Sequence, residues 1–297
     1  MSTRTTTARE SERLPTLYIP HGGGPCFFME WTMGPRNTWD AMAAWLRSLG
    51  ERFDKPKALL VISGHWEEPV VTVQTGAHPP LLFDYYGFPP SSYQLTWPAP
   101  GAPAVATRVR SLLAAAGVPT QEDPDRGFDH GTFIPLKVAY PEAKIPALQL
   151  SLNANLDAAD HLAIGRALAP LRDEGVLIVG SGMSFHNMRA FRGGGPAQEQ
   201  SRQFDGWLEQ ACQDPTRRNA ALANWDRAPQ ARFSHPREEH LLPLMVAAGA
   251  ADGEAGRRIF QDTVMGVVVS AFEFGGPAPV SAVHPVIRPG RPVEVNP

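Results

Sequence analysis

The chain has 297 residues, of which 43% are hydrophobic and 19% are charged, so it is long enough to bury a full hydrophobic core. Its formal net charge of −3 argues against a nucleic-acid partner, because proteins that follow a phosphate backbone usually carry a strong basic excess. The two cysteines, Cys26 and Cys212, form no CxxC pattern, which argues against a disulfide framework and against a thiolate metal site.

Short apolar, β-branched runs alternate with longer segments of helical period, a pattern typical of an α/β domain. The predicted strands cover residues 16–20, 58–63, 70–74, 145–152, 176–180 and 265–274. The predicted helices cover residues 37–49, 104–116, 158–172, 198–212, 216–225 and 237–248. We therefore expect a single α/β domain with a central mixed or mostly parallel sheet flanked by helices.

The ends of the chain differ from its middle. Residues 1–13 are polar and lack the apolar core of a signal peptide, so we expect a disordered tail, followed by the main domain at 14–276 and a C-terminal extension at 277–297. No stretch approaches the run of about 20 apolar residues that a membrane helix needs, which predicts a soluble protein without a membrane partner. The two cysteines, with no disulfide framework, fit a reducing cytoplasm, so we expect a cytoplasmic protein. Residues 78–103, rich in proline and aromatic residues, are expected to form a long irregular loop that walls a pocket.

Three of the nine histidines follow directly after predicted strands: His21 in PHGGGP, His65 in SGHW and His186 in SFHN. The carboxyl ends of the strands in an α/β sheet meet at the edge where ligands bind. His130, in FDHGT before a probable helix, and His240, near a helix start, add two more. Because neutral imidazole suits both zinc and iron, this arrangement predicts a metal site.

The remaining histidines and the glycine turn also have interpretations other than a metal site. A single histidine is more often solvated or held by a structural hydrogen bond, and we assign His78, His161 and His284 to that class. The HGGGP turn lacks the lysine and hydroxyl residue of a phosphate-binding loop, so nucleotide binding is not expected. A lipase-like oxyanion turn is not expected either, because GSGMS does not match the GxSxG nucleophile motif.

Six stretches in this order resemble the class III extradiol dioxygenases, and among them the 4,5-DOPA dioxygenase-like branch. They are PHGGGP at His21, SGHW at His65, DYYGFP at 84–89, DHGT at His130, GSGMSFHN at His186 and SHPREEHLLPL at His235 and His240. The resemblance as a whole covers about residues 17–274. The resemblance implies that residues 14–276 form the catalytic domain. It also implies that a small catechol and O2 are the partners, with nucleic acid and membrane excluded and the choice between monomer and homo-oligomer left open.

The resemblance implies one divalent metal, Fe(II) in the active form or Zn(II) as isolated. His21 and His65 would hold it, with further imidazole from His186 and His240. Better-studied members of the superfamily use two histidines and a glutamate. Here His240 takes the carboxylate position, although Glu239 beside it stays an alternative ligand.

The remaining roles follow from the same resemblance. His130 would orient substrate or dioxygen, and His186 would act as acid and base if it is not a permanent ligand. The aromatic loop would wall the substrate ring, and the candidate substrate contacts are Tyr85, Tyr86, Phe88, His235 and Arg126. Arg126 could receive a substrate carboxylate, and His235 could instead orient the metal ligands or serve only in a turn.

Two rival functions remain open at this point. A zinc-dependent hydrolase would use the same imidazoles to activate water, and it predicts activity on esters or amides without dependence on O2. A non-catalytic homologue would keep the metal pocket as a binding site. The presence of both His130 and His186 argues against the second, because a protein that had lost catalysis would often have lost one of them.

Overall fold

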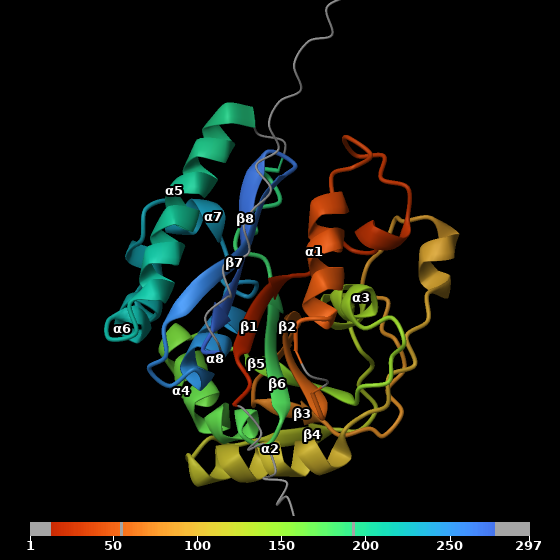
Figure 1. The fold of residues 1–297 in the computed structure, drawn as a ribbon, viewed down its shortest axis with the longest axis vertical. Helices are drawn as coiled ribbons and strands as arrows, with labels where there is room; N and C mark the ends of the chain where they lie inside the picture. The colour runs from red at the N-terminus through yellow and green to blue at the C-terminus, as the bar shows by residue number, and fades with distance from the viewer. Residues whose placement is uncertain (1–12, 54–55, 192–193, 277–297) are drawn as a thin grey trace, which may run out of the picture.

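An eight-stranded sheet organises the protein, in the strand order β4-β3-β5-β2-β6-β1-β8-β7 (Figure 1). The computed structural model describes residues 13–53, 56–191 and 194–276, so the expected tail, apart from Arg13, and the expected C-terminal extension lie outside the described residues. The strands are β1 (Thr16–Pro20), β2 (Ala58–Glu68), β3 (Thr72–Gln74), β4 (Gln121–Asp123), β5 (Ala147–Asn153), β6 (Val176–Gly182), β7 (Gly256–Val264) and β8 (Val267–Phe274).

The centre of the sheet is parallel and its margins are mixed. Strands β5, β2, β6 and β1 run parallel to one another, whereas β8 is antiparallel to β1 and β3 is antiparallel to β5. Helices cover both faces of the sheet, so successive side chains of a strand point alternately into two apolar cores. Leu60 and Ile62 of β2 lie in one core, and Leu59 and Val61 lie in the other. The expected α/β domain with a mixed sheet is confirmed.

The helices divide between these two faces. The α-helices are α1 (Asp40–Gly50), α2 (Pro103–Ala115), α3 (His130–Ala139), α4 (Ala158–Leu168), α5 (Gly194–Gln213), α6 (Arg218–Ala223), α7 (Ala231–Ser234) and α8 (Leu242–Ala250). Helices α4 and α8 pack on one face with α2, α5 and α6 around them, and α1 and α3 pack on the other (Figure 1). No helix within the described residues is long and apolar enough to span a membrane.

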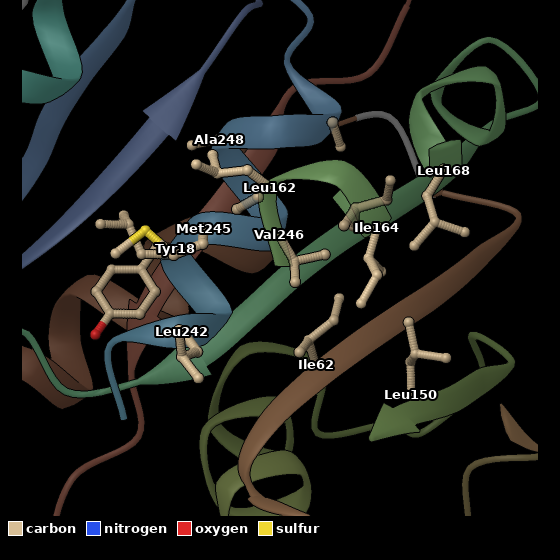
Figure 2. Close-up of a cluster of buried hydrophobic side chains, with 14 of the residues drawn as sticks. Tyr18, Ile62, Leu150, Leu162, Ile164, Leu168, Leu242, Met245, Val246 and Ala248 are labelled. Carbon is tan, nitrogen blue, oxygen red and sulfur yellow. The ribbon is translucent and has the colours of Figure 1, made fainter. Parts of the chain in front are cut away.

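Helices α4 and α8 pack unusually close together above the sheet. Figure 2 shows Leu162 of α4 and Val246 of α8 side by side over Ile62. A Cβ atom on Gly165 would lie 2.1 Å from the Val246 carbonyl oxygen, and one on Gly249 would lie 2.1 Å from the Leu162 carbonyl oxygen. The two helices therefore approach as closely as they do because both positions lack a side chain.

We expect Gly165→Ala to destabilise the protein by about 1–3 kcal/mol, because the added methyl group would have to push α8 away from α4. Gly206→Ala is the matched control, since nothing lies within 4 Å of the Cβ position of Gly206 in α5. That variant should gain up to about 1 kcal/mol from helix propensity. Urea denaturation measures both, and a stabilised Gly165→Ala variant would contradict the close packing.

Three local features differ from the prediction. Residues 265–274 do not begin a single strand, because Met265 and Gly266, with φ of 50° and 88°, form the two-residue turn of a β7–β8 hairpin. The helix expected from residue 237 begins at Leu242, where Pro243 suits the first turn of a helix. Strand β4 and helix α7 are too short to produce a recognisable period.

Candidate metal centre and substrate pocket

His21 lies immediately after β1, at the carboxyl end of the parallel sheet. Its Nδ1 donates to the carbonyl oxygen of Gly22 at 2.9 Å, and in this tautomer Nε2 is left as the unprotonated nitrogen. Gly22 and Gly24 have φ of 83° and 54°, a backbone conformation that favours glycine. The glycine turn thus reverses the chain behind the ring and fixes its direction.

His65 lies where the pairing of β2 with β5 is interrupted. The register shifts between Ile62 and Glu67, so residues 63–66 form an irregularity of the kind that re-aims side chains at sheet edges. The backbone N–H of His65 donates to Ser63 Oγ at 3.2 Å, and Ser63 Oγ donates to Asp129 Oδ1 at 2.8 Å. This short network holds the irregular segment in place.

His240 precedes α8 and lies against the end of β6. A Cβ atom on Gly182 would be 2.1 Å from the His240 carbonyl oxygen, so only glycine in β6 lets the segment before α8 come this close. Tyr18 Oη donates to the same carbonyl oxygen at 2.7 Å. The sheet therefore positions His240 as directly as it positions His21.

These three imidazoles meet at one point. His65 Nε2 is 3.3 Å from His21 Nε2 and 3.2 Å from His240 Nε2. Two nitrogens bound to one tetrahedral zinc at 2.0–2.1 Å would be about 3.3–3.4 Å apart, so the spacing fits a shared ion. Burial and the neighbouring imidazoles lower the pKa of all three well below 6.5, which keeps the rings neutral as metal ligands require.

Glu239 lies behind this group rather than within it. Its Oε1 accepts from Nδ1 of His240 at 3.0 Å and from Nδ1 of His186 at 3.1 Å. The rings of His186 and His240 are stacked, with centroids 3.4 Å apart. Burial raises the pKa of Glu239, but the hydrogen bonds from His186 and from the backbone, together with the charges of His186 and Arg237, outweigh it, and the pKa lies below its usual value. An ionised Glu239 thus fixes the orientation of both rings.

A second carboxylate, Asp84, holds His130, which is the first residue of α3. Asp84 Oδ1 accepts from the backbone N–H of His130 at 2.9 Å and from its Nδ1 at 2.8 Å, while Oδ2 is 3.7 Å from Nδ1 of His65. Burial raises the pKa of Asp84, but the hydrogen bonds from His130, together with the charges of His130 and His65, outweigh it and lower the pKa. With Nδ1 occupied, Nε2 is the nitrogen of His130 left to accept a proton.

The imidazoles form the floor of a pocket of about 360 Å³. Tyr85, Tyr86 and Phe88, which the sequence predicted as ring contacts, all line it together with His130 and His186. The Tyr85 hydroxyl donates to the Ser92 carbonyl oxygen at 2.6 Å, so it is already engaged, whereas Tyr86 is 90% exposed at the rim. The size of the pocket suits one small aromatic ligand.

Nearly the whole chain matches a known protein family. Residues 15–273 match the family model described as the catalytic LigB subunit of aromatic ring-opening dioxygenase. The chain belongs to the LigB family. The predicted resemblance to the extradiol dioxygenases is therefore confirmed, and the matched residues contain every histidine of the site.

Individual relatives agree with this LigB assignment. The chain is 36% identical to Dioxygenase tasH of Hapsidospora irregularis, over 88% of this chain and 86% of the relative. It is 43% identical to 4,5-DOPA dioxygenase extradiol of Portulaca grandiflora, over 66% of this chain and 73% of that one. The crystal structure of an uncharacterized protein from Escherichia coli K12 superposes with a TM-score of 0.70 at 31% identity. The superposition covers 89% of this chain and 100% of that chain.

Two residues that the sequence put forward as substrate contacts lie outside the pocket of this LigB-family chain. Arg126 Nη2 is 3.2 Å from Asp129 Oδ2, and its guanidinium lies over the Trp66 ring at 4.8 Å. His235 is fully buried, and its Nε2 donates to the Ser184 carbonyl oxygen at 3.0 Å. Asp84, by contrast, lines the pocket but was not predicted as a site residue. The sequence indicated the motif DYYGFP that contains it, but not its carboxylate.

His235 makes a testable contribution to acid sensitivity. Burial lowers its pKa to about 3, below the value of about 6.5 expected in the unfolded chain. The unfolded chain therefore binds one more proton between these values, and stability falls as pH decreases from about 6.5 toward 3, by up to about 1.4 kcal/mol per pH unit. Urea denaturation at several pH values in this range gives the slope of the unfolding free energy against pH. This slope should be smaller for His235→Gln by up to about 1.4 kcal/mol per pH unit, the contribution of one proton. An unchanged slope would contradict the assignment.

Proposed function

We propose that this LigB-family protein is an extradiol dioxygenase that uses O2 to open the ring of a catecholic substrate next to the diol, giving a muconic semialdehyde-type product. The observation that carries the proposal is the convergence of Nε2 atoms from His21, His65 and His240 on the floor of an aromatic pocket. The family match supplies the reaction type. A catechol is the aromatic compound whose two adjacent oxygens suit a single metal ion.

The proposal includes one divalent metal, held by His21, His65 and His240, with Fe(II) in the active form. When bound, Fe(II) supplies a Lewis acid for the catechol oxygens and the redox capacity that O2 requires, whereas Zn(II) supplies only the Lewis acid. The three neutral, converging imidazoles fit such an ion. Glu239 would orient His240 from the opposite side of the ring, in the manner of a carboxylate behind a ligating histidine.

The other polar residues would handle protons. His130, with Nδ1 held by Asp84, would accept the proton of a catechol hydroxyl at Nε2. His186, with Nδ1 held by Glu239, lines the pocket and would return a proton to the opening ring. The sequence left His186 open as either ligand or acid and base. His186 is not part of the group formed by His21, His65 and His240, and its Nδ1 is held by Glu239, which favours the second role.

The test is reconstitution of the protein with Fe(II) without oxygen, followed by addition of air and a panel of catechols. Uptake of O2 with formation of a yellow product is the expected result. The Zn(II)-loaded protein is the control and should consume no O2. Absence of O2 uptake with every catechol, together with hydrolysis of an ester by the Zn(II) form, would replace the proposal with the hydrolase.

We also propose that the protein works in the cytoplasm. Cys26 and Cys212 are both buried and unpaired. Reducing compartments keep thiols in this state.

A further inference from the structure

The ionisable side chains that line the pocket in the described part of the chain carry no permanent positive charge. Among the described residues, those that line it include His21, His65, His130, His186 and His240, and Asp84 is its carboxylate, whereas no lysine or arginine is present. Asp84 accepts from the backbone N–H and from Nδ1 of His130, so it has no proton to offer a second carboxylate in this arrangement. A substrate carboxylate would therefore meet a carboxylate, and no arginine or lysine of these described residues, in the pocket.

The mouth of the pocket is apolar. Four large hydrophobic side chains of the described residues are exposed, and three of them, Met33, Tyr86 and Met188, line this pocket. Such a concentration of exposed apolar side chains around a cavity marks a binding surface. Methionine side chains adapt to ligands of irregular shape, so the mouth suits an apolar substituent that extends outward from the ring.

Two arginines lie nearby in the described part of the chain, and neither supplies a cation to the pocket. Arg126 is paired with Asp129 and lies over Trp66, outside the pocket. Arg189 follows Met188 on the exposed segment, but it does not line the pocket. A neighbouring cavity of about 700 Å³ shares Met33 and Met265 with the pocket, and its ionisable residues are Asp40 and Asp262.

We infer that the preferred substrate is a neutral catechol bearing an apolar ring substituent, and that catechols whose side chain ends in a carboxylate are poor substrates. This inference rests on the proposed function, because it assigns the substrate class of the same site. The ring lies among the aromatic residues over the imidazoles, and the substituent passes between Met33 and Met188. A carboxylate on that substituent loses solvation without gaining a cationic partner, whereas an alkyl group gains by leaving water.

The test compares two substrates of nearly equal shape with the Fe(II)-loaded full chain: 4-propylcatechol and 3-(3,4-dihydroxyphenyl)propanoate. The propyl compound should be cleaved with a kcat/KM at least about tenfold higher than that for the propanoate. The methyl ester of the propanoate separates charge from polarity, and it should be used nearly as well as the propyl compound. Dissociation constants measured from the fluorescence of Trp31 and Trp39, which line the pocket, should follow the same order without depending on turnover.

Variants at the mouth sharpen the test. Met188 is 70% exposed, so Met188→Lys should fold normally and should raise kcat/KM for the propanoate several-fold relative to the propyl compound. Met188→Gln is the uncharged control, and it should change this ratio much less than Met188→Lys does, because it removes apolar contact without adding a charge. Arg189→Gln should leave the ratio unchanged, because the inference gives Arg189 no part in binding.

The possible failures are distinguishable. Equal or better use of the propanoate by the unmodified enzyme would overturn the inference and leave ring cleavage in place, as would loss of propanoate activity in Arg189→Gln. Selective binding of the propyl compound without O2 uptake or product would overturn the proposed function and leave the preference of the pocket standing.

Discussion

Replacing His65 with alanine should reduce kcat/KM for catechol cleavage by more than about 100-fold, beyond the loss typical of residues that only support a metal ligand. His65 Nε2 is close to the Nε2 atoms of both His21 and His240, so the variant loses the central member of the group. The metal content should fall well below one ion per chain. Elemental analysis and O2 uptake, measured on the same reconstituted sample, check both expectations.

The control for this variant is His78→Ala, which removes an exposed histidine outside the pocket and should change neither metal content nor activity. Because the His65 side chain is only 21% exposed, the urea midpoint of the variant is measured as well, and O2 uptake is compared where both proteins are folded. A His65→Ala protein that binds one Fe(II) and retains activity would show that the metal is held elsewhere.

Asp84→Asn should lower kcat about 10- to 100-fold while metal content stays near one ion per chain. The carboxylate offers two acceptor oxygens, one to His130 and one near Nδ1 of His65. Asparagine offers one acceptor and one donor, so its amide nitrogen would face an imidazole N–H on one side or the other. His130 or His65 then loses its orientation although every ring is still present.

Asp125→Asn provides the control, because Asp125 is an exposed carboxylate that does not line the pocket. The informative readout is the division of the effect between kcat and KM. A loss confined to KM would mean that Asp84 contacts the substrate rather than orienting His130. An unchanged kcat would show that Asp84 does not position His130 for the reaction.

The fold was predictable where hydrophobic period and strand ends were clear. The runs that became β1, β2 and β6 are apolar on both faces, which is how buried parallel strands are recognised. The β7–β8 hairpin was missed because the turn at Met265 and Gly266 lacks the asparagine or aspartate that usually signals it. Local propensity also overextended the helix that begins at Leu242.

The site was predictable in the part that the sheet determines. His21 and His65 were expected to meet because both follow strands of one parallel sheet, and their Nε2 atoms do meet. The carboxylates behind the imidazoles were not predictable, because the contact of Asp84 with His130 joins residues that are 46 positions apart. Sequence proximity also misled in the case of His235, five residues before His240 yet turned into the core.

In the proposed function, the metal ligands and the residues that select the substrate come from different kinds of structure. His21, His65 and His240 are fixed by strands and by glycine contacts in the sheet, whereas Tyr86 and Met188 project from connecting segments. Mutations in the connecting segments can therefore alter which molecules bind in the pocket without weakening the binding of the metal ion. Such a division lets selection, in nature or in the laboratory, change the substrate while the metal ligands stay the same. Asp84, which lies in a connecting segment, would have to be retained for this.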